Sequence, residues 1–131
     1  MRTSAGAETI LIVDDDPESL MLYGEFLSDS GYTVIAQRDG VSALSAVREA
    51  SSIDLVITDY QMPDMSGLDF IKELRNVLPA VQVIMLTAYG DIETYFRSRA
   101  LGVFEFVNKP VRKREFERIV RAAIEKSRTS A

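Results

Sequence analysis

The chain contains no cysteine and no histidine among its 131 residues. Without cysteine it can form neither a disulfide nor a thiolate metal site. Without histidine it cannot carry a phosphohistidine, a Ser-His catalytic pair or an imidazole metal ligand. No apolar run approaches the roughly 18 residues that a membrane span needs, and no segment resembles a signal peptide. We therefore expect a cytoplasmic protein with no membrane contact.

The overall composition is ordinary for one globular domain of this length. Hydrophobic residues make up 47% of the chain and charged residues 27%. The net charge of −5 argues against a nucleic-acid-binding surface. The chemistry of any site must therefore come from carboxylates, hydroxyls and amines.

Short runs rich in β-branched residues alternate with amphipathic segments along the chain. The runs are almost entirely apolar, which is typical of strands that are buried on both faces. They lie at residues 9–13, 33–36, 54–58, 81–86 and 103–108.

The amphipathic segments between these runs predict five helices. Asp16 and Pro17 are typical of a helix start, and Gly31 of a helix end. The fourth helix is expected from Asp91 to about Arg99 and the fifth from near Arg112. The apolar stripes of the other helices comprise Leu20, Tyr23 and Leu27; Ala43, Leu44 and Val47; Leu68, Ile71, Leu74 and Leu78; and Phe116, Ile119, Val120, Ala123 and Ile124.

Five strands that alternate with five helices predict an α/β fold, a doubly wound parallel sheet covered on both faces. We favour the strand order 2-1-3-4-5, in which ligands bind beyond the carboxyl ends of strands 1 and 3. We expect residues 1–8 to form a flexible N-terminal arm, residues 9–127 the domain, and residues 128–131 a tail or a truncated linker.

Polar side chains stand at the carboxyl ends of four of the predicted strands. Asp14 and Asp15 follow the first strand and Asp59 follows the third, while Thr87 and Lys109 follow the fourth and fifth. Because parallel strands end at the same edge of a sheet, these side chains should lie close together. Asp14 and Asp15 could instead belong with Asp16 to the cap of the first helix, but a cap needs only one acid.

Three clustered carboxylates repel one another, by about 4 kcal/mol for a pair about 4 Å apart at an effective dielectric of about 20. Lys109 supplies only one positive charge. With oxygen ligands alone, a hard divalent cation is expected, Mg²⁺ before Mn²⁺ or Ca²⁺. Mg²⁺ uses one or two carboxylates and phosphate oxygens, which leaves one carboxylate as a nucleophile toward a phosphoryl group.

Four segments together resemble the receiver domain of a two-component response regulator. They are residues 10–17, residues 59–63 with Gly67, residues 87–88 and residues 106–110. The resemblance covers about residues 9–126, and it implies the flavodoxin-like (βα)5 fold, which also supports the strand order. It implies a phosphorelay protein that accepts a phosphoryl group and that is not a turnover enzyme, although it catalyses its own phosphorylation and dephosphorylation.

The resemblance also implies roles for individual residues. Asp59 resembles the phosphoacceptor, Asp15 a direct Mg²⁺ ligand and Asp14 the acid that orients a metal-bound water. The backbone carbonyl of Gln61 would be a further metal ligand beside Asp59.

Three further residues resemble the parts of the family's switch. Thr87 resembles the switch hydroxyl, Lys109 the lysine that pairs with the phosphoryl group, and Phe106 the switch aromatic residue. The peptide bond between Lys109 and Pro110 is expected to be cis.

The resemblance implies a sensor histidine kinase or a phosphotransfer protein as the phosphoryl donor. The output is expected through the face made by the fourth helix, the fifth strand and the fifth helix, toward an effector domain, a target protein or a second copy. Tyr95 and Phe96 lie on the fourth helix of this face. Its fifth helix carries Arg112, Arg114, Arg118 and Arg121 interleaved with Glu115 and Glu117.

Three alternatives remain at this point. An FMN-binding flavodoxin would need a loop rich in Ser, Thr and Gly after the first strand, where this chain has three aspartates. A phosphatase of the haloacid dehalogenase type would need a second acid at position 61, which is Gln61. A degenerate receiver that only binds partners would lack part of the set formed by Asp14, Asp15, Asp59, Thr87 and Lys109.

Overall fold

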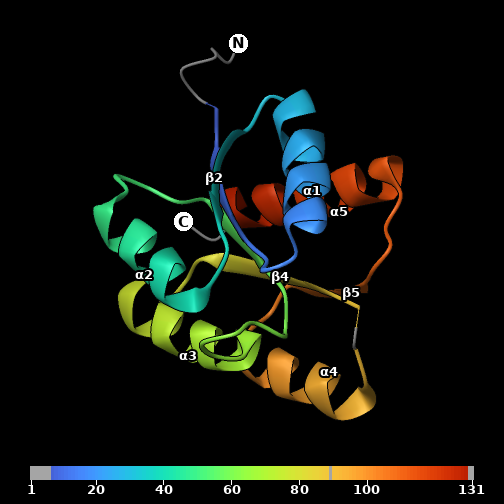
Figure 1. Cartoon of the computed structure of the whole chain (residues 1–131). Coiled ribbons are helices and arrows are strands. Elements are labelled where there is room, and N and C mark those ends of the chain that lie inside the picture. The colour runs from blue at the N-terminus through green and yellow to red at the C-terminus, as the bar shows by residue number, and fades with distance from the viewer. Residues whose placement is uncertain (1–6, 89, 130–131) are drawn as a thin grey trace.

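The computed structural model describes residues 7–88 and 90–129. Strands and helices alternate strictly along them (Figure 1). The strands are β1 (Thr9–Val13), β2 (Thr33–Gln37), β3 (Leu55–Thr58), β4 (Gln82–Thr87) and β5 (Glu105–Asn108). The helices are α1 (Pro17–Asp29), α2 (Gly40–Glu49), α3 (Gly67–Val77), α4 (Ile92–Ala100) and α5 (Lys113–Thr129). All five predicted strands and all five predicted helices are present.

The five strands form one parallel sheet in the order β2-β1-β3-β4-β5, as predicted. Val13 at the end of β1 pairs with Thr58 at the end of β3, so the segments that follow these strands leave the sheet side by side. Helices α1 and α5 cover one face of the sheet, and α2, α3 and α4 cover the other (Figure 1). This is the doubly wound arrangement, and its switch point lies between β1 and β3.

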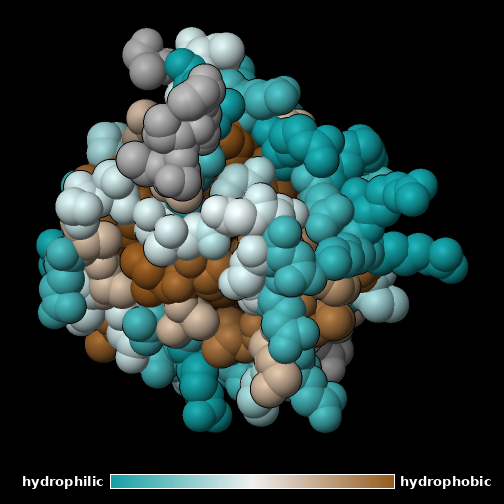
Figure 2. Space-filling model, turned by 90° about the horizontal axis from the view of Figure 1, so that it is seen from above, coloured by the Kyte–Doolittle hydropathy of each residue, from teal (hydrophilic) through white to brown (hydrophobic). Residues whose placement is uncertain are grey.

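The sheet separates two hydrophobic cores. Alternate residues of a strand point to opposite faces, so Ile10 and Ile12 pack with α1 and α5, whereas Leu11 and Val13 pack with α2 and α3. The helices expose mainly polar residues, although α1 and α4 also expose large apolar side chains. A view from above shows many hydrophilic residues on that face, with hydrophobic residues gathered toward its middle (Figure 2).

The prediction that every strand is buried on both faces is correct for β1, β3 and β4 but wrong for the two edge strands. β2 and β5 contain only exposed and half-buried residues, for example the exposed Thr33 and Ala36 of β2. The helices cover the middle of the sheet, so the strands at its margins keep part of their surface in water.

Polar side chains cap the helices where the sequence places helix starts. Asp16 accepts a hydrogen bond from the amide of Glu18, and Pro17 is the first residue of α1, as predicted. Gly31 follows the end of α1 with a φ of 93°, a left-handed conformation that glycine adopts without strain. Asp91 caps α4 through the amide of Thr94.

Helix α5 begins at Lys113, so Arg112 precedes the helix rather than belonging to it. It continues to Thr129, past residue 127, where we expect the domain to end. Arg128 there forms an ion pair with Glu8, whose carbonyl accepts a hydrogen bond from the amide of Thr33. Glu8 is therefore fixed to the domain, whereas residues 1–6 of the expected arm and residues 130–131 of the expected tail lie outside the described residues.

Arg75 near the end of α3 joins two loops that precede the strands β4 and β5. Its guanidinium donates hydrogen bonds to the carbonyls of Val81 at 2.6 Å, Leu101 at 3.1 Å and Gly102 at 3.2 Å. A cation is favourable beside the carbonyl groups that end helices α3 and α4. The contact fixes the starts of β4 and β5. β4 ends at Thr87, and Lys109 directly follows the end of β5.

Within residues 7–88 and 90–129, no helix combines the length and the apolar character that crossing a membrane requires.

Candidate functional site

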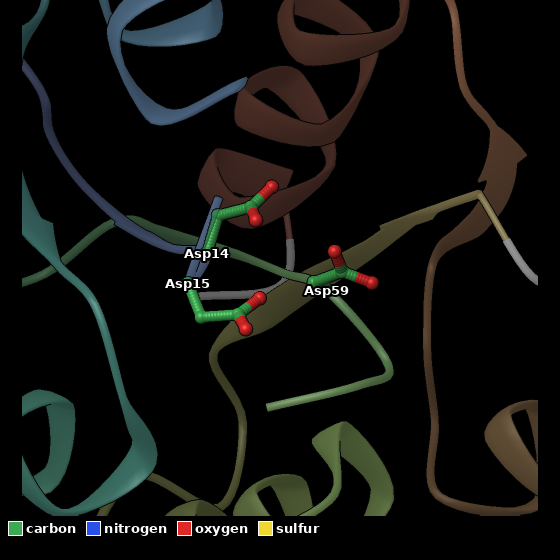
Figure 3. Close-up of side chains that lie close together, drawn as sticks. All are labelled: Asp14, Asp15 and Asp59. Carbon is green, nitrogen blue, oxygen red and sulfur yellow. The ribbon is translucent and has the colours of Figure 1, made fainter. Parts of the chain in front are cut away.

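Three acidic side chains converge at the carboxyl edge of the sheet. Asp14 and Asp15 follow β1 and Asp59 follows β3, and one carboxylate oxygen of each lies within 4.8 Å of the others. The three side chains lie near one another at the ends of these strands (Figure 3). Asp14 and Asp59 are buried, with 3% and 7% of their surface exposed, whereas Asp15 faces solvent. The convergence predicted from the strand ends is therefore confirmed.

Lys109 reaches into this cluster from the end of β5. Its Nζ lies 2.6 Å from Asp14 Oδ2, 3.0 Å from Asp59 Oδ2 and 3.3 Å from Ser19 Oγ. Burial acts to lower the pKa of Lys109, but hydrogen bonds and charges of Asp14 and Asp59 outweigh it, so the pKa is raised. The ammonium therefore stays charged between the two buried carboxylates.

The single ammonium does not neutralise the cluster. Burial raises the pKa of Asp14, although Lys109 and the amide of Asp16 act in the opposite direction, and the charge of Asp59 adds to the increase. Three carboxylates and one ammonium carry a net negative charge, which a further cation would offset. The atoms that the three acids offer as ligands are all oxygens. The donor set fits a hard divalent cation.

Backbone amides orient the two buried carboxylates. Asp14 Oδ1 accepts from the amide of Asp16 at 3.0 Å. Asp59 Oδ1 accepts from the amide of Tyr60 at 2.6 Å and more weakly from that of Gln61 at 3.4 Å. The Gln61 side chain is exposed, and the role of its carbonyl as a metal ligand stays a prediction.

Gly67 allows the loop after Asp59 to fold back onto the start of α3. A Cβ atom at this position would lie 2.1 Å from the carbonyl oxygen of Asp59 and 2.9 Å from the Cα of Tyr60. The amide of Gly67 instead donates to the carbonyl of Tyr60 at 2.6 Å. Any side chain at position 67 would therefore displace the backbone of Asp59, the candidate phosphoacceptor.

Thr87 and Phe106 lie on the neighbouring strands β4 and β5. Thr87 is fully buried, and its carbonyl accepts from the amide of Lys109 at 2.9 Å. Phe106 is half-buried and packs edge-on against Tyr95 of α4, with ring centroids 5.8 Å apart. A Cβ atom on Gly90 would lie 2.6 Å from the Phe106 ring, so glycine makes room for the aromatic side chain. The predicted cis bond between Lys109 and Pro110 is confirmed.

An open groove of about 1090 Å³ lies over the acids. Its lining includes Glu18, Ser19 and Leu22 of α1 and the loop of residues 61–66. Asp59, Lys109 and Pro110 also line the groove. A reactant can therefore approach Asp59 from solvent.

Sequence reasoning missed two residues that support the site. Ser19 contacts Lys109, as described above, and Asp64 anchors the loop after Asp59. Asp64 accepts hydrogen bonds from the amides of Gly40 at 3.1 Å and Val41 at 2.8 Å, at the start of α2. No local pattern could reveal this contact, because the partners lie 23 and 24 residues apart in the chain.

Comparison with known proteins identifies the family. The family profile described as "Response regulator receiver domain" matches residues 10–121. The chain belongs to this family. The receiver is thus a signalling domain of two-component response regulators, as the resemblance implies.

Curated relatives are longer than this receiver. It is 37% identical over 118 residues to the transcriptional regulatory protein GlrR of Escherichia coli (strain K12), which covers 90% of the receiver and 26% of GlrR. It is also 37% identical over 121 residues to the transcriptional regulatory protein CpxR of Klebsiella pneumoniae subsp. pneumoniae (strain HS11286), covering 92% of the receiver and 51% of CpxR. The chain therefore spans about a quarter to a half of these proteins.

Solved structures of receivers have the same fold. A CheY-like receiver domain protein from Methanospirillum hungatei JF-1 superposes with a TM-score of 0.91 at 25% identity, covering 96% of this chain and all of that one. A receiver domain from Clostridium thermocellum gives a TM-score of 0.87 at 30% identity, covering 95% and 99%. The flavodoxin-like fold predicted from the sequence is thus confirmed.

Replacing Asp64 with alanine should lower the free energy of unfolding by about 1 kcal/mol at neutral pH, because two helix amides lose their acceptor. The slight burial of Asp64 acts to raise its pKa, but the amides of Val41 and Gly40 outweigh it and hold the pKa below 3.8. A lowered folded pKa means that the stabilisation is complete above the unfolded value and is lost as the pH falls through the folded pKa.

Urea unfolding of the parent and of Asp64→Ala, from pH 7 down to about pH 3, measures this difference. The gap between the two proteins should shrink in acid. Glu73→Ala, which removes an exposed carboxylate from the middle of α3, serves as the matched control and should change stability by less than about 0.5 kcal/mol. A difference in the free energy of unfolding that does not change with pH would contradict the hydrogen bonds from the amides of Gly40 and Val41 to Asp64.

Proposed function

We propose that the receiver accepts a phosphoryl group on Asp59 from a histidine kinase or a phosphotransfer protein, with Mg²⁺, and that this changes the face formed by α4, β5 and α5. It acts as a phosphoacceptor that catalyses its own phosphorylation and dephosphorylation, not as a turnover enzyme. The observation that carries the proposal is the convergence of Asp14, Asp15, Asp59 and Lys109 beside an open groove in a chain of this family.

The proposed metal site consists of Asp14, Asp15, Asp59 and the backbone carbonyl of Gln61. Support comes from the three carboxylates, one oxygen of each lying within 4.8 Å of the others, and from the absence of histidine and cysteine in the sequence. Mg²⁺ suits such a site, with Mn²⁺ as the alternative. When bound, the ion would neutralise part of the charge on the transferring phosphoryl group.

Asp59 is the proposed nucleophile because both of its carboxylate oxygens are held in place. Tyr60 orients Oδ1 and Lys109 orients Oδ2. A carboxylate oxygen forms a bond to phosphorus, the bond between phosphorus and the donor's imidazole nitrogen breaks, and that nitrogen retains the electron pair. Lys109 then lies within reach of a phosphoryl oxygen and can balance its charge.

Replacing Asp59 with asparagine should abolish phosphorylation by acetyl phosphate and Mg²⁺, because the amide is a poor nucleophile. Intact mass spectrometry of the parent should show a gain of about 80 Da for one phosphoryl group, and chelation of the metal should prevent it. Asp69→Asn, an exposed acid on α3, is the control and should label as the parent does. Phosphorylation of the Asp59→Asn variant would refute the assignment of Asp59 as the phosphoacceptor.

Mg²⁺ should raise the melting temperature of the unphosphorylated protein, because it binds the folded acid cluster and not the unfolded chain. At a tenfold excess over its dissociation constant, the ion should add about 1.4 kcal/mol to the free energy of unfolding. Thermal scans with MgCl₂ against NaCl of equal ionic strength measure the shift. Asp15→Ala should remove it, whereas Asp69→Ala should retain it; an unshifted parent at millimolar Mg²⁺ would refute the metal site.

The proposed switch links Asp59 to the face of α4, β5 and α5 through Thr87 and Phe106. A phosphoryl group on Asp59 provides an acceptor toward which the Thr87 hydroxyl can move. The Phe106 ring, which now packs against Tyr95, can then turn inward. A hydrogen bond to a charged acceptor is worth about 1.5–3 kcal/mol, enough for a roughly ten- to hundredfold shift between two states.

The face has the character of a partner surface. Ile92 and Phe96 of α4 expose 75% and 64% of their surface, and Tyr95 beside them is exposed as well. The neighbouring α5 presents arginines, of which Arg118 is paired with Glu115 at 2.6 Å. We propose that an effector domain, a target protein or a second copy of the chain binds here, and the names of the relatives favour an output in transcriptional regulation.

Phosphorylation should therefore change amide chemical shifts mainly within residues 87–125. NMR spectra of the protein with and without the phosphoryl group measure this, and size-exclusion chromatography of the same samples detects a second copy. Changes that cluster on α1 and α2 and spare residues 87–125 would refute the proposed switch.

A further inference from the structure

Helix α1 contacts the loop between β5 and α5 at two points one helical turn apart. The ammonium of Lys109 donates to Ser19 Oγ at 3.3 Å, and the amide of Val111 donates to the Tyr23 hydroxyl at 3.1 Å. Residues four apart lie on the same side of a helix, so Ser19 and Tyr23 face this loop together. Tyr23 fixes the backbone beyond Lys109, whereas Ser19 contacts the reactive end of its side chain.

The three hydrogen-bond partners of the Lys109 ammonium are two carboxylates and one hydroxyl. A lysine ammonium has three N–H donors, and here they meet Asp14, Asp59 and Ser19. The two carboxylates are the groups that the proposed function commits to the metal and to the phosphoryl group. Among the described residues, Ser19 is the one partner of this ammonium that carries no charge and takes no part in that exchange.

Ser19 is itself oriented by its neighbour in the helix cap. Its hydroxyl donates to Asp16 Oδ2 at 3.0 Å, which leaves a lone pair of the oxygen free to accept from Lys109. Asp16 is held through its other carboxylate oxygen by the amide of Glu18. Successive hydrogen bonds of this kind strengthen one another. A chain of hydrogen bonds thus ties the ammonium to the start of α1.

We propose that Ser19 is a positioning residue for phosphoryl transfer, which holds the Lys109 ammonium over Asp59 while its carboxylate contacts are exchanged. The inference rests on the proposed function of the site. When Asp59 Oδ2 turns to attack phosphorus, Lys109 loses an acceptor, and its flexible four-carbon stem would let the ammonium turn toward the solvent of the groove. The contact with Ser19 restricts that movement, so the ammonium remains in place to meet the phosphoryl oxygen.

Two variants of equal shape isolate the hydroxyl. Ser19→Thr retains it and Ser19→Val replaces it with a methyl group, and the two residues have similar helix propensities. With acetyl phosphate and saturating Mg²⁺, Ser19→Val should be phosphorylated roughly fivefold more slowly than the parent, the loss expected for one long hydrogen bond to a charged group. Ser19→Thr should stay within about twofold of the parent, and the Mg²⁺ concentration for half-saturation should be equal in all three.

A second measurement tests positioning directly in the metal-free, unphosphorylated protein. The ¹⁵N NMR signal of the Lys109 ammonium, assigned by its loss in Lys109→Arg, reports proton exchange with water. Exchange should be faster in Ser19→Val than in the parent and in Ser19→Thr. Slow phosphorylation of Ser19→Val together with fast proton exchange of its Lys109 ammonium supports the positioning role of Ser19. Slow phosphorylation with unchanged proton exchange overturns that role.

The outcomes separate this inference from the function on which it rests. A parent that takes up no phosphoryl group overturns the proposed function and the role of Ser19 with it. A parent that is labelled, with equal rates in Ser19→Val and Ser19→Thr, overturns only the role of Ser19.

Discussion

The ammonium of Lys109 between the buried carboxylates of Asp14 and Asp59 is the interaction on which the site depends. Three elements must be in register for it to form, because the groups come from β1, β3 and β5. β4 lies between β3 and β5, so strands about 4.8 Å apart place the start of the lysine side chain about 10 Å from β3. A long side chain is therefore required, and the bond from the Lys109 amide to the Thr87 carbonyl fixes where it starts.

The same ion pairs bear on whether the site would bind a further cation. Removing one partner of a buried ion pair typically costs about 3–5 kcal/mol, so the cluster cannot lose its cation without penalty. The cluster nevertheless keeps an excess of negative charge, because three carboxylates share one ammonium. Burial is the main cause of the raised pKa of Asp14, and the charge of Asp59 adds to it. Such a site would attract a second cation, and the groove lined by Asp59 and Lys109 would give the proposed ion and the proposed phosphoryl donor access from solvent.

The elements that the sequence predicts well are those with a local pattern. Apolar runs and cap residues indicated every strand and helix, and the rule that parallel strands end at one edge brought Asp14, Asp15, Asp59 and Lys109 together. Burial of the edge strands was predicted wrongly, because composition alone does not tell a central strand from a marginal one. The contacts of Ser19, Asp64 and Arg75 depend on which loops meet in space, and no spacing along the chain encodes them.

The packing of α4 would suit it to carry the proposed signal. Its buried residues are Thr94 and Ser98, and its large apolar side chains point outward, whereas α3 and α5 each bury several large apolar residues. Little apolar burial means a small free-energy cost for local movement. The loop after Asp59, in contrast, is fixed to α2 by Asp64 and to α3 by the close approach at Gly67. A change at Asp59 that cannot move its own loop would act on the neighbouring ends of β4 and β5, and α4 is the helix there that resists least. The weak apolar pattern of residues 91–99 in the sequence has the same origin, since a helix that buries few apolar residues leaves little periodicity to detect.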